Sequence, residues 1–177
     1  MKPEFKSKFL SHLLRSKKDQ DKGFTLIELC MVIIVISILS AIALPSFLSK
    51  ANKARQVEAK LYVGSCNRAQ QVHFAEHGEF GVFISELGLG IQTQTTNYDY
   101  TTVPTNAGSI TDNAICFGTP NRVGLRGYAG MVGLQQTGFA NEVTSTSILC
   151  QEQVAAVAAP ANPTSATQCA GTQDPVL

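Results

Sequence analysis

The sequence is poor in the short patterns that mark catalytic sites. It has no G-x-S-x-G elbow, no Walker phosphate loop, no paired-carboxylate arrangement and no C-x-x-C pair. The usual signs of hydrolytic, nucleotide-binding and thiol-redox catalysis are therefore missing. We predict that the chain is not an enzyme, and we expect neither a cofactor nor a metal site.

One pattern imitates a metal site. His73-Phe74-Ala75-Glu76-His77 fits the H-x-x-E-H pattern of inverted zinc metallopeptidases, and histidines four residues apart share a helix face. A hydrolytic zinc site also needs a third protein ligand, an open coordination position and a substrate cleft. We interpret the pair as solvent-side histidines near a helix end, where a positive charge favours the helix dipole.

Charge is also absent from the run Leu29 to Leu48, in which most residues are Val, Ile, Leu, Ala or Met. A helix of about 20 such residues is long enough to cross the hydrocarbon core of a bilayer. Glu28 lies at the entry of this run. An ionised acid costs roughly 2.5–3.5 kcal/mol at the centre of a membrane helix and less near its ends, so Glu28 needs a partner.

The sequence offers Glu28 no nearby cation. Lys22 lies on the other side of Gly23, and the next basic residue is Lys50. A cut after Gly23 would change this, because the new amino terminus of Phe24 would be a cation at the same depth.

The residues Gly23-Phe24-Thr25-Leu26-Ile27-Glu28, followed by an apolar helix, resemble the processing site and amino terminus of type IV pilins and their pseudopilin relatives. The resemblance implies that a prepilin peptidase cuts between Gly23 and Phe24 and methylates the new amine of Phe24. It also implies that Glu28 pairs with the amine of a neighbouring subunit. Pro45 stands where pilins commonly carry a proline, and we expect it to loosen or kink the helix because it removes one backbone donor.

The similarity continues beyond the apolar run. The segment from Ala51 to Gln71 resembles the helix of cyanobacterial pilins, and the rest of the chain follows the family only in general pattern. Two features depart from that pattern: the leader is longer than in many pilins, and Cys30 occupies a position where an aliphatic residue is expected.

Four segments are predicted. Residues 1–23 form a cytoplasmic leader that is removed, and residues 24–48 form a transmembrane or filament-core helix. Residues 49–77 continue it as an amphipathic helix, for a total of about 80 Å at 1.5 Å per residue. Gly78 is a natural stop signal. Residues 78–177 form a small head with a tethered tail.

The amphipathic part follows a spacing of three and four residues. We expect its apolar stripe to comprise Ala51, Ala54, Val57, Leu61, Ala69 and Val72, with Tyr62 beside them. We expect its solvent side to carry Lys53, Lys60, Asn67 and Gln71.

The head is predicted to contain an antiparallel sheet packed on the helix, an α+β arrangement. The expected strands are Tyr98 to Val103, Ala114 to Thr119, Gly127 to Gln135 and Thr144 to Gln151. The expected turns are Asn106-Ala107-Gly108, Pro120-Asn121 and Thr137-Gly138. The tail from Val154 to Leu177 is rich in Ala, Pro, Thr and Gln, and by itself we expect it to be loose.

Five cysteines in an exported chain indicate an oxidising compartment. Cys30 lies in the apolar run and is interpreted as a reduced packing residue, which leaves four cysteines and three possible pairings. Cys150 with Cys169 is favoured, since it closes a loop of about 20 residues and restrains the unfolded chain by roughly 3 kcal/mol. The resemblance favours it too, because pilins often have a carboxy-terminal disulfide loop. Cys66 would then pair with Cys116, although spacing alone leaves the alternatives open.

The net charge of +1 conceals an asymmetry. Lys and Arg number seven against three acids before the proposed cut, and seven against ten after it. A basic segment ahead of an apolar helix keeps the amino terminus in the cytoplasm and sends the rest across the membrane. Arg122, Arg126 and Tyr128 could form a small phosphate-binding patch, but a solvated turn is the simpler interpretation, so nucleic acid is not indicated as a partner.

We therefore predict a structural subunit of a type IV pilus that serves motility, adhesion or DNA uptake. Its precursor would wait in the inner membrane, and the assembled subunit would be extracellular. The expected partners are further copies of the chain, the prepilin peptidase, the pilus assembly machinery and, before assembly, the lipid bilayer.

Two alternatives were weighed. The first is a type II secretion pseudopilin, which shares the motif; two disulfides and the lack of a convincing acidic calcium loop favour a pilin. The second is a secreted binding module or enzyme with a conventional signal peptide, cleaved after Ala43 and starting near Leu44. Against this second reading, the apolar run is long for a signal and Glu28 would have no purpose there.

Overall fold

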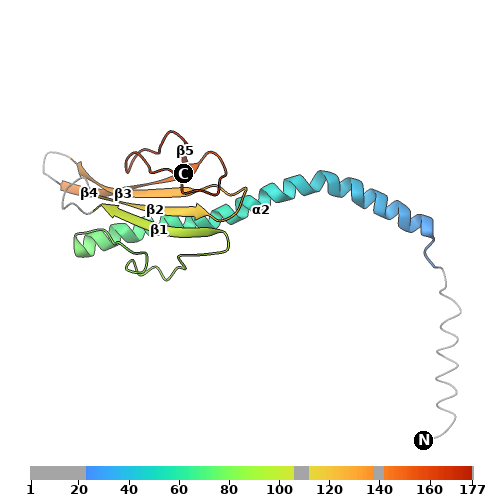
Figure 1. Ribbon diagram of the computed structural model, residues 1–177, viewed down its shortest axis with the longest axis horizontal. Helices are drawn as coiled ribbons and strands as arrows, with labels where there is room; N and C mark the ends of the chain where they lie inside the picture. Colours follow the sequence, from blue (N-terminus) through green and yellow to red (C-terminus); the bar gives the residue numbers. More distant parts are fainter. Residues whose placement is uncertain (1–22, 106–111, 138–141, 177) are drawn as a thin grey trace, which may run out of the picture. The chain divides into compact units, whose positions relative to one another are not determined.

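The computed structural model describes residues 23–105, 112–137 and 142–176. Figure 1 shows one long helix and a five-stranded sheet. The chain divides into two compact units, one ending at Phe47 and the other beginning at Leu48. The elements are α2 (Leu26–His77), β1 (Tyr98–Thr105), β2 (Asn113–Pro120), β3 (Tyr128–Thr137), β4 (Glu142–Glu152) and β5 (Gln173–Pro175).

Helix α2 begins two residues after the predicted start at Phe24 and ends at the predicted residue, His77. Gly78 has a left-handed backbone with φ of 77°, and its N–H donates to the carbonyl of Phe74 over 2.8 Å. This is the αL type of helix end, for which glycine carries no steric cost. Pro45 lies inside the helix without ending it.

The five strands form one antiparallel sheet in the order β1-β2-β3-β4-β5. Strands β1 to β4 occupy the predicted positions, extended by one or two residues at most ends. The α+β prediction is therefore confirmed. The predicted turns around Asn106–Gly108 and at Gly138 lie outside the described residues, as does the predicted leader over residues 1–22.

One face of the sheet packs on the second half of α2. Ala59, Val63 and Cys66 on the helix are buried in one cluster with side chains from the strands and the loops beside them. Those partners include Tyr98, Tyr100, Cys116, Leu125 and Tyr128.

The predicted apolar stripe of α2 was wrong. Val57, Leu61 and Val72 are 51–58% exposed, whereas Asn67, which was expected on the solvent side, is buried. The sheet selects a different face of the helix, at whose centre lie two amide side chains, Gln70 and Asn67. All the amide atoms of Gln70 are hydrogen-bonded, which offsets the cost of burying them. Asn67 is paired only through Nδ2, and its buried Oδ1 has no partner among the described residues.

Gln70 shows how this works. It is fully buried, and its Nε2 donates to the carbonyl of Gly81 over 2.8 Å and to Thr102 Oγ1 over 3.0 Å. Its Oε1 accepts the Gly81 N–H over 2.9 Å. One glutamine thus joins the helix, the segment after it and strand β1. Asn67 contacts strand β4, where its Nδ2 donates to the Ile148 carbonyl over 3.0 Å.

Two glycines in the sheet allow the helix to come this close. A Cβ on Gly118 would lie 3.1 Å from a methyl of Val63 and 3.5 Å from the Cβ of Ala59. A Cβ on Gly130 would lie 2.8 Å from Cγ of Asn67. The distance from a Cβ at position 130 to Asn67 is shorter than packed atoms tolerate, so Gly130 is required for the position of Asn67.

The described part of the tail, residues 154–176, is held to the sheet by more than the expected tether at Cys169. Ala166 packs with Ile115 and Met131 in a separate buried cluster, and residues 173–175 add the fifth strand to the sheet. Glu152 Oε1 accepts the Ala161 N–H over 2.7 Å and Gln173 Nε2 over 3.0 Å. Polar contacts to the backbone order this segment, and its composition does not reveal them.

Two disulfides join the cysteines in the pairs that the sequence analysis favoured. Cys66 on α2 is bonded to Cys116 on β2, and Cys150 on β4 is bonded to Cys169 in the tail. The first disulfide links the helix to the sheet. The second holds the tail against β4, the strand with which β5 pairs. Cys30 is a free thiol.

The contact between Gly130 and Asn67 predicts the effect of a single methyl group. Gly130→Ala should lower the free energy of unfolding by about 1–3 kcal/mol, because the added Cβ overlaps the buried amide. Thermal unfolding of the full chain in detergent, followed by circular dichroism, measures this. Gly64→Ala is the control: no atom lies within 4 Å of its Cβ position, and alanine favours a helix interior, so this variant should be no less stable than the wild type. Equal stability of both variants would contradict the packing argument.

Candidate functional site

The amino-terminal end of α2 is closed by a reciprocal cap. Glu28 Oε2 accepts the Thr25 N–H and the Thr25 hydroxyl, each over 2.8 Å. The Glu28 N–H in turn donates to Thr25 Oγ1 over 3.3 Å. This is a capping box, with Thr25 before the first helical turn and Glu28 three residues later. The pattern Thr25-Leu26-Ile27-Glu28 carried that signal, and the sequence analysis did not use it.

The cap gives Glu28 a partner within its own chain. The carboxylate accepts the free N–H of Thr25 at the start of the helix, and its negative charge is stabilised by the positive end of the helix dipole. Phe24 precedes the cap and is 88% exposed, and Gly23 is exposed too. The structure thus brings Thr25 to Glu28 and leaves the residues of the expected cut open.

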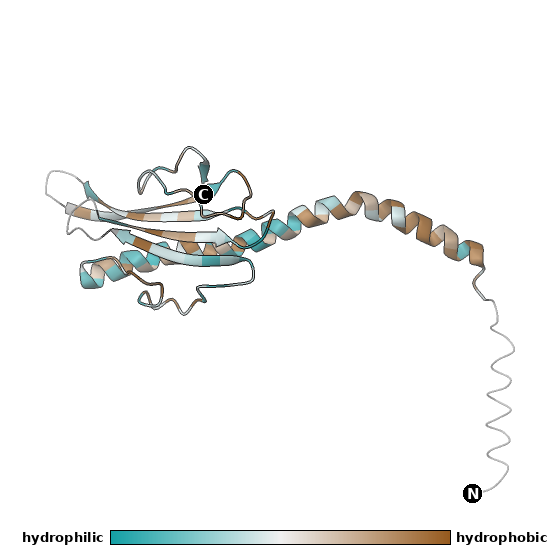
Figure 2. Cartoon of the chain, viewed as in Figure 1, coloured by the Kyte–Doolittle hydropathy of each residue, from teal (hydrophilic) through white to brown (hydrophobic). Residues whose placement is uncertain are grey.

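The apolar part of α2 has no cover within the described chain. An 18-residue window of this helix is apolar enough to cross a membrane, and none of that window is buried. Figure 2 shows mostly hydrophobic residues along the first part of α2 and a mixture of hydrophobic and hydrophilic residues further along it. Ser37 does not interrupt this surface, because its hydroxyl donates to the Ile33 carbonyl over 2.6 Å. Such a surface is stable in lipid or against other apolar helices.

A second apolar surface lies further along α2. Val57, Leu61 and Val72 are separated by four and eleven residues, which places them on one side of a helix with 3.6 residues per turn. All three are exposed, while the sheet covers the side that carries Val63. We call these three residues the outer stripe.

Glu58 holds the segment before the sheet to the helix. Its Oε1 accepts the Thr95 hydroxyl over 2.6 Å and the Tyr100 hydroxyl over 3.2 Å, and its Oε2 accepts Asn97 Nδ2 over 2.8 Å. Partial burial is the largest influence and raises the pKa of Glu58. The three hydrogen bonds to the charged form together outweigh it, so the pKa lies below its usual value.

The pKa values of the neighbouring tyrosines are raised, whereas that of Glu58 is lowered. Burial is the main cause that raises the pKa of Tyr98, Tyr100 and Tyr128, and the negative charge of Glu58 adds to the rise for the first two. Each of these phenols therefore remains a neutral hydroxyl, and Tyr100 can donate to Glu58.

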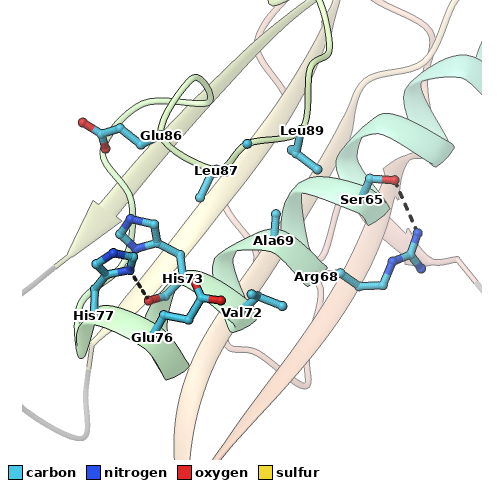
Figure 3. Close-up of a pocket in the computed structure, with 11 residues that line it drawn as sticks. Ser65, Arg68, Ala69, Val72, His73, Glu76, His77, Glu86, Leu87 and Leu89 are labelled. Atoms are coloured by element: carbon cyan, nitrogen blue, oxygen red, sulfur yellow. Dashed lines mark hydrogen bonds between the residues drawn. The ribbon is translucent and has the colours of Figure 1, made fainter.

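The two histidines of the zinc-like pattern lie in the last turns of α2, beside a groove bounded by residues 86–89 (Figure 3). Their rings stack with centroids 4.3 Å apart. His73 Nδ1 is 2.9 Å from the Glu79 carbonyl, and His77 Nδ1 is 3.2 Å from the His73 carbonyl. Across the described residues, no group of three or more potential metal ligands is found. The pair therefore lacks the third protein ligand that a zinc site requires.

Comparison with known proteins assigns the family. A family model described as "Type IV pilin-like G and H" matches residues 56–173, and a "Prokaryotic N-terminal methylation motif" matches residues 18–44. The chain belongs to the type IV pilin-like family. The first match covers the part of α2 that packs on the sheet together with the sheet itself, and the second covers the capping box and most of the apolar run.

Individual relatives carry pilus names. The type IV major pilin protein PilA of Myxococcus xanthus is 39% identical over 70 residues, which cover 40% of this chain and 32% of that protein. A fimbrial protein of Neisseria meningitidis is 36% identical over 72 residues, 41% of this chain and 42% of the relative. The type IV wide pilus major component PilA4 of Thermus thermophilus is 29% identical over 89 residues, 50% of this chain and 68% of the relative. The matched part is thus less than half of the first two relatives, and the likeness to cyanobacterial pilins stays a prediction.

The cluster around Glu58 predicts a pH dependence. A carboxylate whose pKa is lowered by folding stabilises the folded state above its unfolded pKa, near 4.5, and that contribution is lost as the pH falls through the lower folded value. Glu58→Gln should therefore be less stable than the wild type at pH 7, and the difference should shrink below about pH 4.5. Thermal midpoints of the full chain in detergent between pH 3 and 7 measure this. Glu76→Gln, the same change at an exposed position of α2, should leave the wild-type profile unchanged; a constant difference for Glu58→Gln would contradict the role of its charge.

Proposed function

We propose that the chain is a structural subunit of a type IV pilus filament. The observation that carries this proposal is the apolar half of α2, which is uncovered throughout its membrane-length window and opens with a single carboxylate. The family, and the pilus names of three relatives, support the same function. Those names favour a pilin over a secretion pseudopilin.

The first step is processing of the precursor. The segments keep the roles expected from the sequence: leader 1–23, membrane helix 24–48, amphipathic helix 49–77 and head 78–177. The precursor is held in the inner membrane by its helix, with the leader in the cytoplasm. A prepilin peptidase cuts after Gly23 and methylates Phe24, which removes seven basic residues and creates an amine beside the helix. The match to a methylation motif over residues 18–44 supports this step.

The second step is the gain of a second partner by Glu28. In the free chain its carboxylate is held by Thr25. In the filament it pairs with the amine of Phe24 from an adjacent copy, and each charge offsets the cost of burying the other. Both hydrogen bonds from Thr25 go to one carboxylate oxygen of Glu28, Oε2. The other carboxylate oxygen therefore remains available for the amine. The cap and the intermolecular pair are therefore compatible.

The remaining contacts are apolar. Lipid and a bundle of apolar helices are similar environments, so a subunit that leaves the bilayer for the filament loses little hydrophobic stabilisation. Pro45 loosens the helix in this segment, because the Ala41 carbonyl lacks its usual donor. The outer stripe extends the contact surface toward the head. A head-to-tail contact that does not close on itself gives an open filament, built with the pilus assembly machinery.

Two substitutions at Glu28 separate the roles of cap and charge. Glu28→Leu should insert into the membrane as the wild type does but lose most of its incorporation into filaments, because the buried amine has no counterion. Glu28→Gln keeps the oxygen acceptor needed by the capping box and lacks the charge. We expect it to fail in incorporation as Glu28→Leu does. Membrane flotation and the amount of subunit in sheared filaments measure the two properties.

The control for this comparison is Thr25→Ala, which removes half of the cap and keeps the carboxylate. It should assemble better than either Glu28 variant. Wild-type assembly by Glu28→Gln would show that the helix cap, rather than a charge pair, is the important interaction, and would overturn the second step.

The site of processing is tested on the mature protein itself. Amino-terminal sequencing and mass spectrometry of filament subunits should show N-methylated Phe24 as the first residue. A start at Leu44 would instead indicate a conventional signal peptide and a secreted protein. An intact leader in assembled filaments would leave Glu28 without the amine, and the proposed pairing would have to be abandoned.

A further inference from the structure

A basic groove lies between the helix and the sheet in the unit that begins at Leu48. It has a volume of about 740 Å³, and the side chains important here are Asn52, Lys53 and Lys60 of α2 together with Arg126, Tyr128 and Gln151. One wall is a turn that closes tightly on the helix. Gly124 has φ of 87°, and a Cβ on it would lie 2.9 Å from Asn52 Nδ2, so glycine is needed for this approach.

The charge of this groove is of one sign. Lys53, Lys60 and Arg126 line it, and none of its lining residues is acidic. Glu58 is the acid closest along α2, but its carboxylate is occupied by Thr95, Asn97 and Tyr100. The part of the chain after Gly23 carries three more acids than bases. Lys53 and Arg126 therefore make this groove a local exception, and it suits a ligand with concentrated negative charge.

The position of the groove along α2 suggests the source of that charge. Lys53 comes five residues after Leu48, the last residue of the uncharged run, which is about 7.5 Å along a helix. The headgroup region on each side of a bilayer is roughly 5–8 Å deep. When the apolar run spans the hydrocarbon core, Lys53 lies at the depth of the lipid phosphates on the exported side.

We propose that this groove binds the phosphate of an anionic phospholipid headgroup while the subunit resides in the membrane. The inference rests on the membrane-resident stage of the proposed function. Lys53 supplies a point charge, and the planar guanidinium of Arg126 suits the oxygens of a phosphate. Asn52, Gln151 and the Tyr128 hydroxyl offer neutral donors around it. The bound lipid holds the head close to the bilayer, and the subunit releases it on entry into the filament.

The test is retention of lipid by the full chain. The protein is purified in neutral detergent, phosphatidylglycerol or phosphatidylcholine is added, and bound lipids are counted by native mass spectrometry. The wild type should prefer phosphatidylglycerol. Lys53→Gln and Arg126→Gln should each weaken that preference about fivefold, since one cation near an anionic headgroup has about this effect on binding. The matched control is Arg68→Gln, the same charge loss at an exposed residue of α2 outside the groove, and it should keep the preference within twofold.

Two competition experiments identify the ligand, and a further variant serves as a control. Inorganic phosphate at 10 mM should not displace the lipid, because it lacks the acyl chains that pack against apolar surface; full displacement would assign the groove to free phosphate. A single-stranded oligonucleotide that binds through Lys53 and Arg126 and excludes the lipid would assign it to nucleic acid. Glu28→Leu should retain the lipid preference, since Glu28 lies outside the groove. An unchanged preference in Lys53→Gln and Arg126→Gln would overturn the lipid site and leave the filament proposal standing.

Discussion

The uncovered apolar helix is the constraint on which the rest of this molecule depends. A membrane-length window of α2 has no buried residue, so it requires a second phase or further copies of itself. Both environments are apolar and distinguish poorly between registers of the helix. In the proposed function, polar atoms of the first turn, those of Thr25 and Glu28, fix the register. In that proposal the charge of Glu28 distinguishes one register from another, which the uncharged side chains of the run do poorly.

In the head, a small sheet is attached to a helix that also has an apolar side exposed to its surroundings. The interface between the sheet and the helix contains buried amide side chains and is not apolar throughout. Gln70 and Asn67 are buried against the sheet, and Gly118 and Gly130 remove the side chains that would keep the helix away. Because the sheet takes this side of α2, Val57, Leu61 and Val72 remain on the surface. The two faces of one helix segment thus serve the fold and the proposed assembly separately.

The sequence predicted the features that arise from local rules. The uncharged run, the stop at Gly78 and four of the five strands depend on composition, φ preference and alternation, all of which act within a few residues. The face of α2 that meets the sheet was predicted wrongly, because apolar spacing cannot show that Gln70 finds three partners from Gly81 and Thr102. Cys169 predicted a tether for the tail, but the contacts of Glu152 and Gln173 were not predicted, because they act over distances in sequence that composition does not encode. The capping box is a local feature too, because Thr25 and Glu28 have the required spacing, but it was not predicted.

The disulfide between Cys66 and Cys116 has a mechanical consequence. These residues are 50 positions apart, and fully extended that length of chain would reach roughly 170 Å. In a fibre under tension, a pull on α2 passes through the covalent bond directly into β2, an interior strand of the sheet. The intervening segment carries no load and cannot be drawn out as slack. A head fastened in this way resists being peeled from its helix by force even where its weaker contacts give way.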